Sequence, residues 1–201
     1  IDLGDPIGGI EDHNKAIELN PNEDTYFDKA MAERRIGNYE SAITDLTKAL
    51  DESLKKAKGW SIGEEFYHCW IGMTHSDMGE HKKAYDDFEK AILCNAEYAT
   101  SYICRGDLNL KMSKYTSALE DYDRAISINP DATVAFLGRG KTKYKLGDYL
   151  NAISDFNRII ELDPNCAIAY HNRGTLNIHL GNKQLGEADI TKAKELSSQN
   201  N

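Results

Sequence analysis

Apolar residues in the stretch 133–165 follow two helical patterns that are separated by a short turn. The first pattern places Phe136, Gly140 and Tyr144 four positions apart, and Gly147 then interrupts it. After this turn the period of three or four resumes at Ala152, Ile153, Phe156, Ile159 and Ile160. Pro164 ends the second pattern, because proline cannot continue a helix. The stretch therefore predicts a helix, a turn and a second helix.

The same pattern recurs in the C-terminal half with a period of 34 residues. An Arg-Gly pair occurs at 105–106, 139–140 and 173–174. An aspartate follows each of these arginines 16 positions later, at Asp121, Asp155 and Asp189. A fixed period of this length indicates stacked supersecondary units instead of one globular core. Such a stack presents an extended surface, which is typical of a binding module.

The repeated unit resembles the tetratricopeptide repeat. That family has an early aromatic residue, a small residue four later, a Gly-x-Tyr turn, an alanine, an aromatic residue, another alanine and a closing proline. A second clean copy consists of Tyr102, Gly106, Tyr115, Ala118, Tyr122, Ala125 and Pro130. In this copy Ser113 replaces the turn glycine. The resemblance implies an all-α fold, a right-handed superhelical solenoid of antiparallel helix pairs with five full repeats after a leading half repeat.

The repeats predict a single solenoid domain over residues 1–201. Residues 1–22 match the second helix of a truncated repeat, and full repeats are expected at 23–64, 65–98, 99–132, 133–166 and 167–201. The first full repeat contains an insertion at about 51–64, where the register slips by eight residues. We expect Asp51–Lys58 to lengthen the second helix by about two turns and Gly59 to end it. Ser61 with Glu64 then predicts a capping box for the next helix. Trp60 is expected in a short loop, where it covers the helix ends or contacts a partner.

The two ends of the array differ in polarity. Glu187 and Lys194 occupy positions at which earlier second helices carry apolar residues, so we expect the last helix to act as a cap with a stop near Asn201. Ile1 falls in the middle of a unit, and no initiator Met precedes it. The pattern therefore predicts further sequence upstream.

Composition argues against two classes of function, nucleic-acid binding and membrane insertion. The formal net charge of −9 argues against general binding to nucleic-acid phosphates. No apolar stretch approaches the roughly 18–20 residues that cross a bilayer, and no signal segment opens the chain, so we expect a cytoplasmic protein without membrane insertion. Cys69, Cys94, Cys104 and Cys166 show no C-x-x-C spacing and are expected to be buried free thiols.

The sequence predicts no catalytic residue, no metal site and no cofactor. Zinc needs clustered ligands, and no cysteine has a near neighbour in the sequence. His171 and His179 lie about 12 Å apart along a helix axis, while His68 and His75 fall at packing positions. The arginines of the Arg-Gly pairs resemble a basic ladder, but we expect them to pair internally with the aspartates 16 positions later.

The predicted binding surface lies on the first helices of the repeats. By the resemblance, residues one turn apart and off the packing face line a groove. They are Phe27, Met31, Arg34, Phe66, Trp70, Met73, Ile103, Asp107, Lys111, Leu137, Lys141, Lys145 and His171. The early members are aromatic or methionine and the later ones are mostly basic, which predicts a protein or peptide partner with an apolar anchor and an acidic stretch. The alternative is that the apolar members pack under neighbouring helices and the lysines form a solvated face.

The function predicted from these residues is a protein-interaction scaffold that binds a peptide or helix, with no catalysis in this segment. A chaperone-tail clamp is not expected, because Asn172 matches one clamp position but Leu137 and Lys141 do not match the others. Two alternatives stay open. The chain is the substrate-recruiting arm of an enzyme whose catalytic domain lies upstream, or it is a self-assembly module that forms a homo-oligomer through its open N-terminal end.

Overall fold

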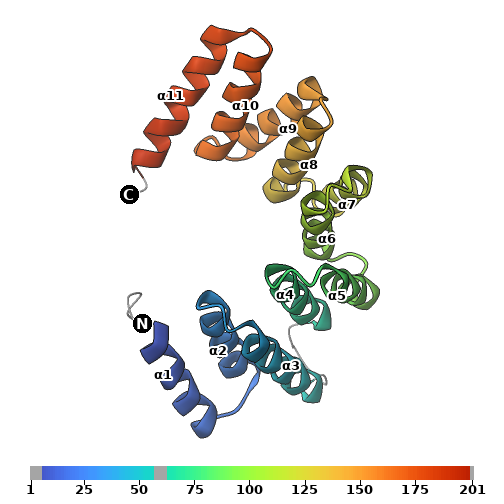
Figure 1. Cartoon of the computed structure of the whole chain (residues 1–201), viewed down its shortest axis with the longest axis vertical. Coiled ribbons are helices and arrows are strands. Elements are labelled where there is room, and N and C mark those ends of the chain that lie inside the picture. Colours follow the sequence, from blue (N-terminus) through green and yellow to red (C-terminus); the bar gives the residue numbers. More distant parts are fainter. Residues whose placement is uncertain (1–5, 57–62, 200–201) are drawn as a thin grey trace. The chain divides into compact units, whose positions relative to one another are not determined.

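The computed structural model describes residues 6–56 and 63–199, and within these ranges the chain is folded into helices without strands (Figure 1). The eleven helices of the described residues are α1 (Pro6–Leu19), α2 (Glu23–Arg35), α3 (Tyr39–Lys55), α4 (Glu64–Asp77), α5 (His81–Cys94), α6 (Ala99–Lys111), α7 (Tyr115–Ile128), α8 (Thr133–Lys145), α9 (Tyr149–Leu162), α10 (Ala167–His179) and α11 (Lys183–Gln199). A lone helix is followed by five helix pairs. The predicted all-α repeat architecture is confirmed.

The chain divides into two compact units, Ile1–Cys104 and Arg105–Asn201. The first unit contains α1, the pairs α2/α3 and α4/α5, and the first part of α6. The second unit contains the rest of α6, α7, and the pairs α8/α9 and α10/α11. None of the helices in the described part of the chain combines the length and the apolarity needed to cross a bilayer.

Close approach of the two helices of a pair depends on a glycine in the first and an aromatic ring in the second. A Cβ atom on Gly140 would lie 2.8 Å from Cε1 of Phe156, and one on Gly72 would lie 2.6 Å from Cε1 of Phe88. Both rings are buried, and Ala152 of α9 is buried in the same core cluster as Phe156. The predicted role of Gly140 as a contact glycine is therefore confirmed.

The turns inside the pairs require a left-handed backbone. Gly147 has a φ of 80°, and Gly37, Gly79 and Gly181 adopt the same conformation at equivalent turns. Ser113 occupies this position between α6 and α7 with a φ of 58°, which is unusual for a residue that has a Cβ. Its identification as the substitute for the turn glycine is confirmed.

The arginines of the Arg-Gly pairs bind aspartates of the partner helix, as the spacing predicted. Nη2 of each arginine lies 2.6 Å from Asp121 for Arg105, 2.6 Å from Asp155 for Arg139, and 2.7 Å from Asp189 for Arg173. All three aspartates are buried. Burial lowers the pKa of Arg139, but Asp155 and Asp123 outweigh this effect and the net pKa is raised. These pairs belong to the architecture of the repeat.

The first two repeats contain the same buried aspartate with other partners. Asp45 in α3 binds Nζ of Lys29 at 2.8 Å, again across a spacing of 16 residues. Asp87 in α5 binds Nδ1 of His75 at 2.7 Å. Burial alone would lower the pKa of Lys29, but the opposite effect of Asp45 and Glu33 is larger, so the net pKa is raised. Every full repeat therefore places a buried aspartate of its second helix against a basic or imidazole group of its first.

The insertion in the first full repeat lengthens α3 by fewer residues than the sequence predicts. α3 has 17 residues where α5, α7 and α9 have 14, and it ends at Lys55 instead of Lys58. The backbone N–H of Lys56 donates to the carbonyl of Ser53 and closes the last turn, while its ammonium pairs with Glu23. Gly63 is the N-cap of α4. The predicted capping box depends on Ser61, so this prediction cannot be compared with the described residues. Gly59, Trp60 and Ser61 lie outside the described residues.

Candidate functional site

An aromatic patch consisting of Phe27, Phe66 and Trp70 joins α2 to α4 in the first unit. The ring centroids lie 5.2 Å apart for Phe27 and Phe66, 5.7 Å for Phe27 and Trp70, and 6.3 Å for Phe66 and Trp70. Phe66 and Trp70 are one helical turn apart and therefore share a face of α4. All three side chains are half-buried, so the patch offers apolar surface to solvent.

The inner side of the aromatic patch rests on a close-packed core. Phe27 and Phe66 pack against Ala49, Leu50 and Tyr67, of which Tyr67 is only 1% exposed. Trp70 packs, together with Phe27, against a second cluster of Ala30, Ala42, Leu46 and Ile71. Each of these rings therefore packs against the core on one side and remains partly exposed to solvent on the other. A rigid support of this kind limits the conformational entropy that the rings lose when a ligand covers them.

Arg34 borders the patch on α2. Its guanidinium carbon lies 5.2 Å from the centroid of the Trp70 ring, a cation–π distance. Nη2 and Nε of the same side chain donate to Oδ2 of Asp77 at 2.6 and 3.0 Å. The charge of Arg34 is therefore already matched within the unit, and the pair holds one face of the indole in place.

Five of the predicted surface residues thus meet in one cluster, because Met31 packs against the same core as Phe27 and Trp70. Met73 in α4 and Ile103 in α6 are half-buried and complete the predicted set of the first unit.

The predicted residues of the second unit include a small polar cluster around Asp107. The buried Tyr122 donates its hydroxyl to Oδ1 of Asp107 at 2.6 Å. Asp107 is exposed as a residue, but desolvation of its carboxyl group raises its pKa, and Tyr122 and Lys141 oppose this effect without reversing it. Lys141 is exposed on α8, so its ammonium is accessible to solvent. Leu137 of the same helix packs against the core of the second unit.

The other basic residues of the second unit have different environments. Lys111 and Lys145 are exposed at the ends of α6 and α8. Lys143, one residue beyond Thr142, instead turns inward and binds Asp155 at 2.8 Å. His171 is exposed on α10 and lines a shallow hollow of about 620 Å³ between α10 and α11. Lys194 and Glu187 of α11 are exposed, as expected for a polar outer face.

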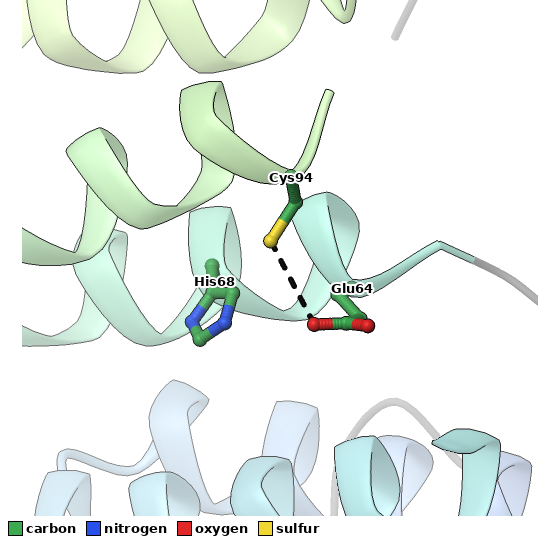
Figure 2. A group of neighbouring side chains, drawn as sticks. All are labelled: Glu64, His68 and Cys94. Atoms are coloured by element: carbon green, nitrogen blue, oxygen red, sulfur yellow. Dashed lines mark hydrogen bonds between the residues drawn. The ribbon is translucent and has the colours of Figure 1, made fainter. Parts of the chain in front are cut away.

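The structure also assembles a group that the sequence did not predict. Glu64 and His68 of α4 and Cys94 of α5 lie side by side, with one ligand atom of each within 4.8 Å of the others (Figure 2). Cys94 is exposed, so the expectation that all four cysteines are buried is wrong; Cys69 and Cys104 are buried and Cys166 is half-buried. Cys94 is exposed because it ends α5, where the chain leaves the packed pair.

Comparison with known families agrees with the helix pairs. One TPR repeat model matches residues 106–147, a tetratricopeptide repeat model matches 137–201, and another matches 23–56 and 67–97. The chain belongs to the tetratricopeptide repeat family. The family's fold supports a protein-interaction scaffold.

A curated member of the family, small glutamine-rich tetratricopeptide repeat-containing protein 2 of Mycosarcoma maydis, is 33% identical over 84 residues. The match covers 41% of this chain and 22% of that protein, so the chain spans about a fifth of the length of its relative.

Solved tetratricopeptide repeat proteins have the same fold. MamA is similar with a TM-score of 0.69 and 20% identity over 85% of this chain and 95% of that one. A tetratricopeptide repeat protein from Parabacteroides merdae is similar with a TM-score of 0.71 and 24% identity. The match covers 96% of this chain and 74% of that one. YrrB, described as a TPR protein with an unusual peptide-binding site, is similar with a TM-score of 0.60 and 25% identity over 93% of each chain.

Proposed function

We propose that this chain binds a peptide segment of a partner protein on the first helices of its repeats, with an apolar anchor on the aromatic patch. The observation that carries the proposal is the half-exposure of Phe27, Phe66 and Trp70 above a close-packed core. Aromatic side chains that are rigid and partly exposed are the residues that contribute most to binding at protein interfaces. The peptide-binding site in the description of YrrB supports a peptide as the ligand.

The second part of the proposal concerns the charge of the peptide. Lys141 and Lys145 are exposed on α8 of a chain whose net charge is −9. Lys143 of the same helix is held by Asp155, so the proposal assigns the acidic stretch to Lys141 and Lys145. Exposed lysines contribute more to association rate and selectivity than to affinity, and salt weakens their effect.

The aromatic patch sets the expected size of the effect. Burying one large apolar side chain contributes about 1.5–3 kcal/mol. Removal of the Trp70 ring takes away much of the surface that covers such an anchor. It also removes the cation–π contact of Arg34, which keeps its ion pair with Asp77. We therefore expect Trp70→Ala to weaken peptide binding by about 10- to 100-fold, since every 1.4 kcal/mol corresponds to a factor of ten.

Fluorescence anisotropy with a panel of labelled peptides tests both parts. The panel combines a Phe, Leu or Trp anchor with a run of Glu residues, and includes the anchor alone, the acidic run alone and a scrambled peptide. We expect the complete peptide to bind most tightly, Trp70→Ala to lose the contribution of the anchor, and Lys141→Glu to lose that of the acidic run. The effect of Lys141→Glu is expected to shrink at high salt.

A matched control is Lys192→Glu, an equal charge reversal at an exposed position of α11. It should bind the panel as the wild type does. If folded Trp70→Ala and Lys141→Glu variants bind the complete peptide with wild-type affinity, the surface assignment is wrong. If no peptide of the panel binds the wild type in preference to the scrambled one, the predicted ligand chemistry is wrong.

A further inference from the structure

Glu64, His68 and Cys94 have the donor set and the placement of a small metal site. Glu64 opens α4 and His68 lies four residues later, so the two side chains stand one turn apart on one face of the helix. Cys94 is the last residue of α5, and the antiparallel pairing of the two helices returns it to the first turn of α4 (Figure 2).

The distances are close to those of a coordinated ion. Sγ of Cys94 lies 3.7 Å from Oε2 of Glu64. Tetrahedral zinc with its usual bond lengths separates neighbouring ligand atoms by about 3.4–3.8 Å. The largest separation among the three ligand atoms is within 4.8 Å, so side-chain rotations that shift one atom by about 1 Å suffice to complete the geometry.

The imidazole of His68 adds a second observation. Its Nδ1 atom is buried and forms no hydrogen bond with any described residue. A buried polar atom without a partner is uncommon in native proteins and calls for an explanation such as an ion. One ring nitrogen of this imidazole is the ligand atom that lies within 4.8 Å of those of Glu64 and Cys94, so an ion at this group would also bind the ring.

Neighbouring residues hold the two helix ends together without using the ligands. Nδ2 of Asn95 donates to Oε1 of Glu65 at 3.0 Å, across the same spacing of 30 residues that separates Glu64 from Cys94. Glu65 is thus engaged in the link between α4 and α5. Glu64 and Cys94 are both exposed, so an ion can reach them from solvent.

We propose that Glu64, His68 and Cys94 bind one Zn²⁺ ion, with a water molecule or an outside group at the fourth position. One sulfur, one nitrogen and one oxygen donor suit zinc, whereas magnesium and calcium prefer oxygen donors throughout. Binding forms a zinc–sulfur bond, and the proton of the Cys94 thiol passes to solvent. The ion would fasten the first turn of α4, which also carries Phe66, to the end of α5.

Cobalt(II) is the probe for this site, because a thiolate ligand gives it a charge-transfer band and tetrahedral coordination gives intense visible bands. The whole reduced chain is titrated with Co²⁺, and Zn²⁺ is then added. We expect a 1:1 complex with both kinds of band, and Zn²⁺ should abolish them. Cys94→Ser should remove the charge-transfer band, while His68→Gln and Glu64→Gln should each weaken Zn²⁺ binding by at least about tenfold in calorimetry.

Cys166→Ser and His13→Gln are the matched controls, because they remove a half-buried cysteine and a half-buried histidine outside the group. Both should bind cobalt as the wild type does. Zn²⁺ should raise the melting temperature of the wild type and of the controls but not of Cys94→Ser. The proposal is overturned if the folded wild type gives no thiolate band, if Cys94→Ser keeps it, or if Cys166→Ser loses it.

Discussion

The buried Asp155 gives the sharpest test of the packing, because it carries the counter-charge for two cations. It is 3% exposed and accepts hydrogen bonds from Nη2 of Arg139 at 2.6 Å and from Nε at 3.1 Å. Nζ of Lys143 lies 2.8 Å from Oδ2, the oxygen that also accepts from Nε of Arg139. Asp155→Asn keeps the shape of the side chain and removes its charge, so both cations lose their buried partner.

The expected loss follows from the exposure of these partners. Breaking a buried ion pair by removing one member costs about 3–5 kcal/mol. Arg139 and Lys143 are 19% and 18% exposed, and Arg139 keeps a 2.6 Å contact with Asp123 at the surface. We therefore expect the lower end of that range, about 3 kcal/mol. For a chain of this size the melting temperature should fall by about 6–12 °C.

Asp123→Asn is the matched control, since it removes the other carboxylate of Arg139, which is 60% exposed. A surface ion pair contributes about 0–1 kcal/mol, so this variant should unfold almost as the wild type does. Urea and thermal unfolding followed by circular dichroism compare the three proteins. Stability in repeat arrays propagates through neighbouring units, so hydrogen exchange of α8 and α9 locates the loss. Equal losses for the two variants, or a loss below about 1 kcal/mol for Asp155→Asn, would refute the reasoning.

Three further predictions concern the second unit. Gly138→Ala should destabilise by about 1–3 kcal/mol, because its Cβ would lie 2.4 Å from the buried Tyr122 ring, whereas Val134→Ala at an exposed position of α8 should be nearly neutral in urea unfolding. Asp107→Asn should raise the melting temperature at pH 7: burial raises the pKa of Asp107 in the folded state, so ionisation opposes folding as pH rises above 3.8, and the gain should vanish below that pH. A pH-independent difference would contradict it. Ser113→Gly should stabilise by about 0.5–1 kcal/mol by relieving its φ of 58°, and a loss in thermal unfolding would argue against strain there.

The sequence predicted those features that depend on spacing within one helix pair. Arg139 contacts Asp155 and Gly140 contacts Phe156, and in both pairs the residues are 16 positions apart. This spacing recurs in the regular repeats and can be read from the sequence. The end of α3 was not predictable in this way. Its composition remains helical to Lys58, but the last turn closes at Lys56.

The group of Glu64, His68 and Cys94 was missed for a different reason. Spacing along the sequence reveals ligands that are close neighbours, whereas Cys94 is 30 residues from Glu64. The signal was nevertheless present. In a pair of antiparallel helices the last residue of the second helix returns to the first turn of the first helix, where Glu64 and His68 have the i, i+4 spacing of two ligands on one face.

The distinction between residues that recur and residues that do not separates architecture from binding in this chain. A buried aspartate occurs in the second helix of every full repeat, because each pair needs the same link between its helices. The residues at intervals of 34 after Trp70 are instead Cys104, Gly138 and Asn172, none of them aromatic. Gly138 is required there by the ring of Tyr122, so the same position admits a neighbouring ring in one repeat and carries a half-buried indole in another. The fold does not require an aromatic residue at this position, and this supports the proposal that the half-buried Trp70 contributes to binding.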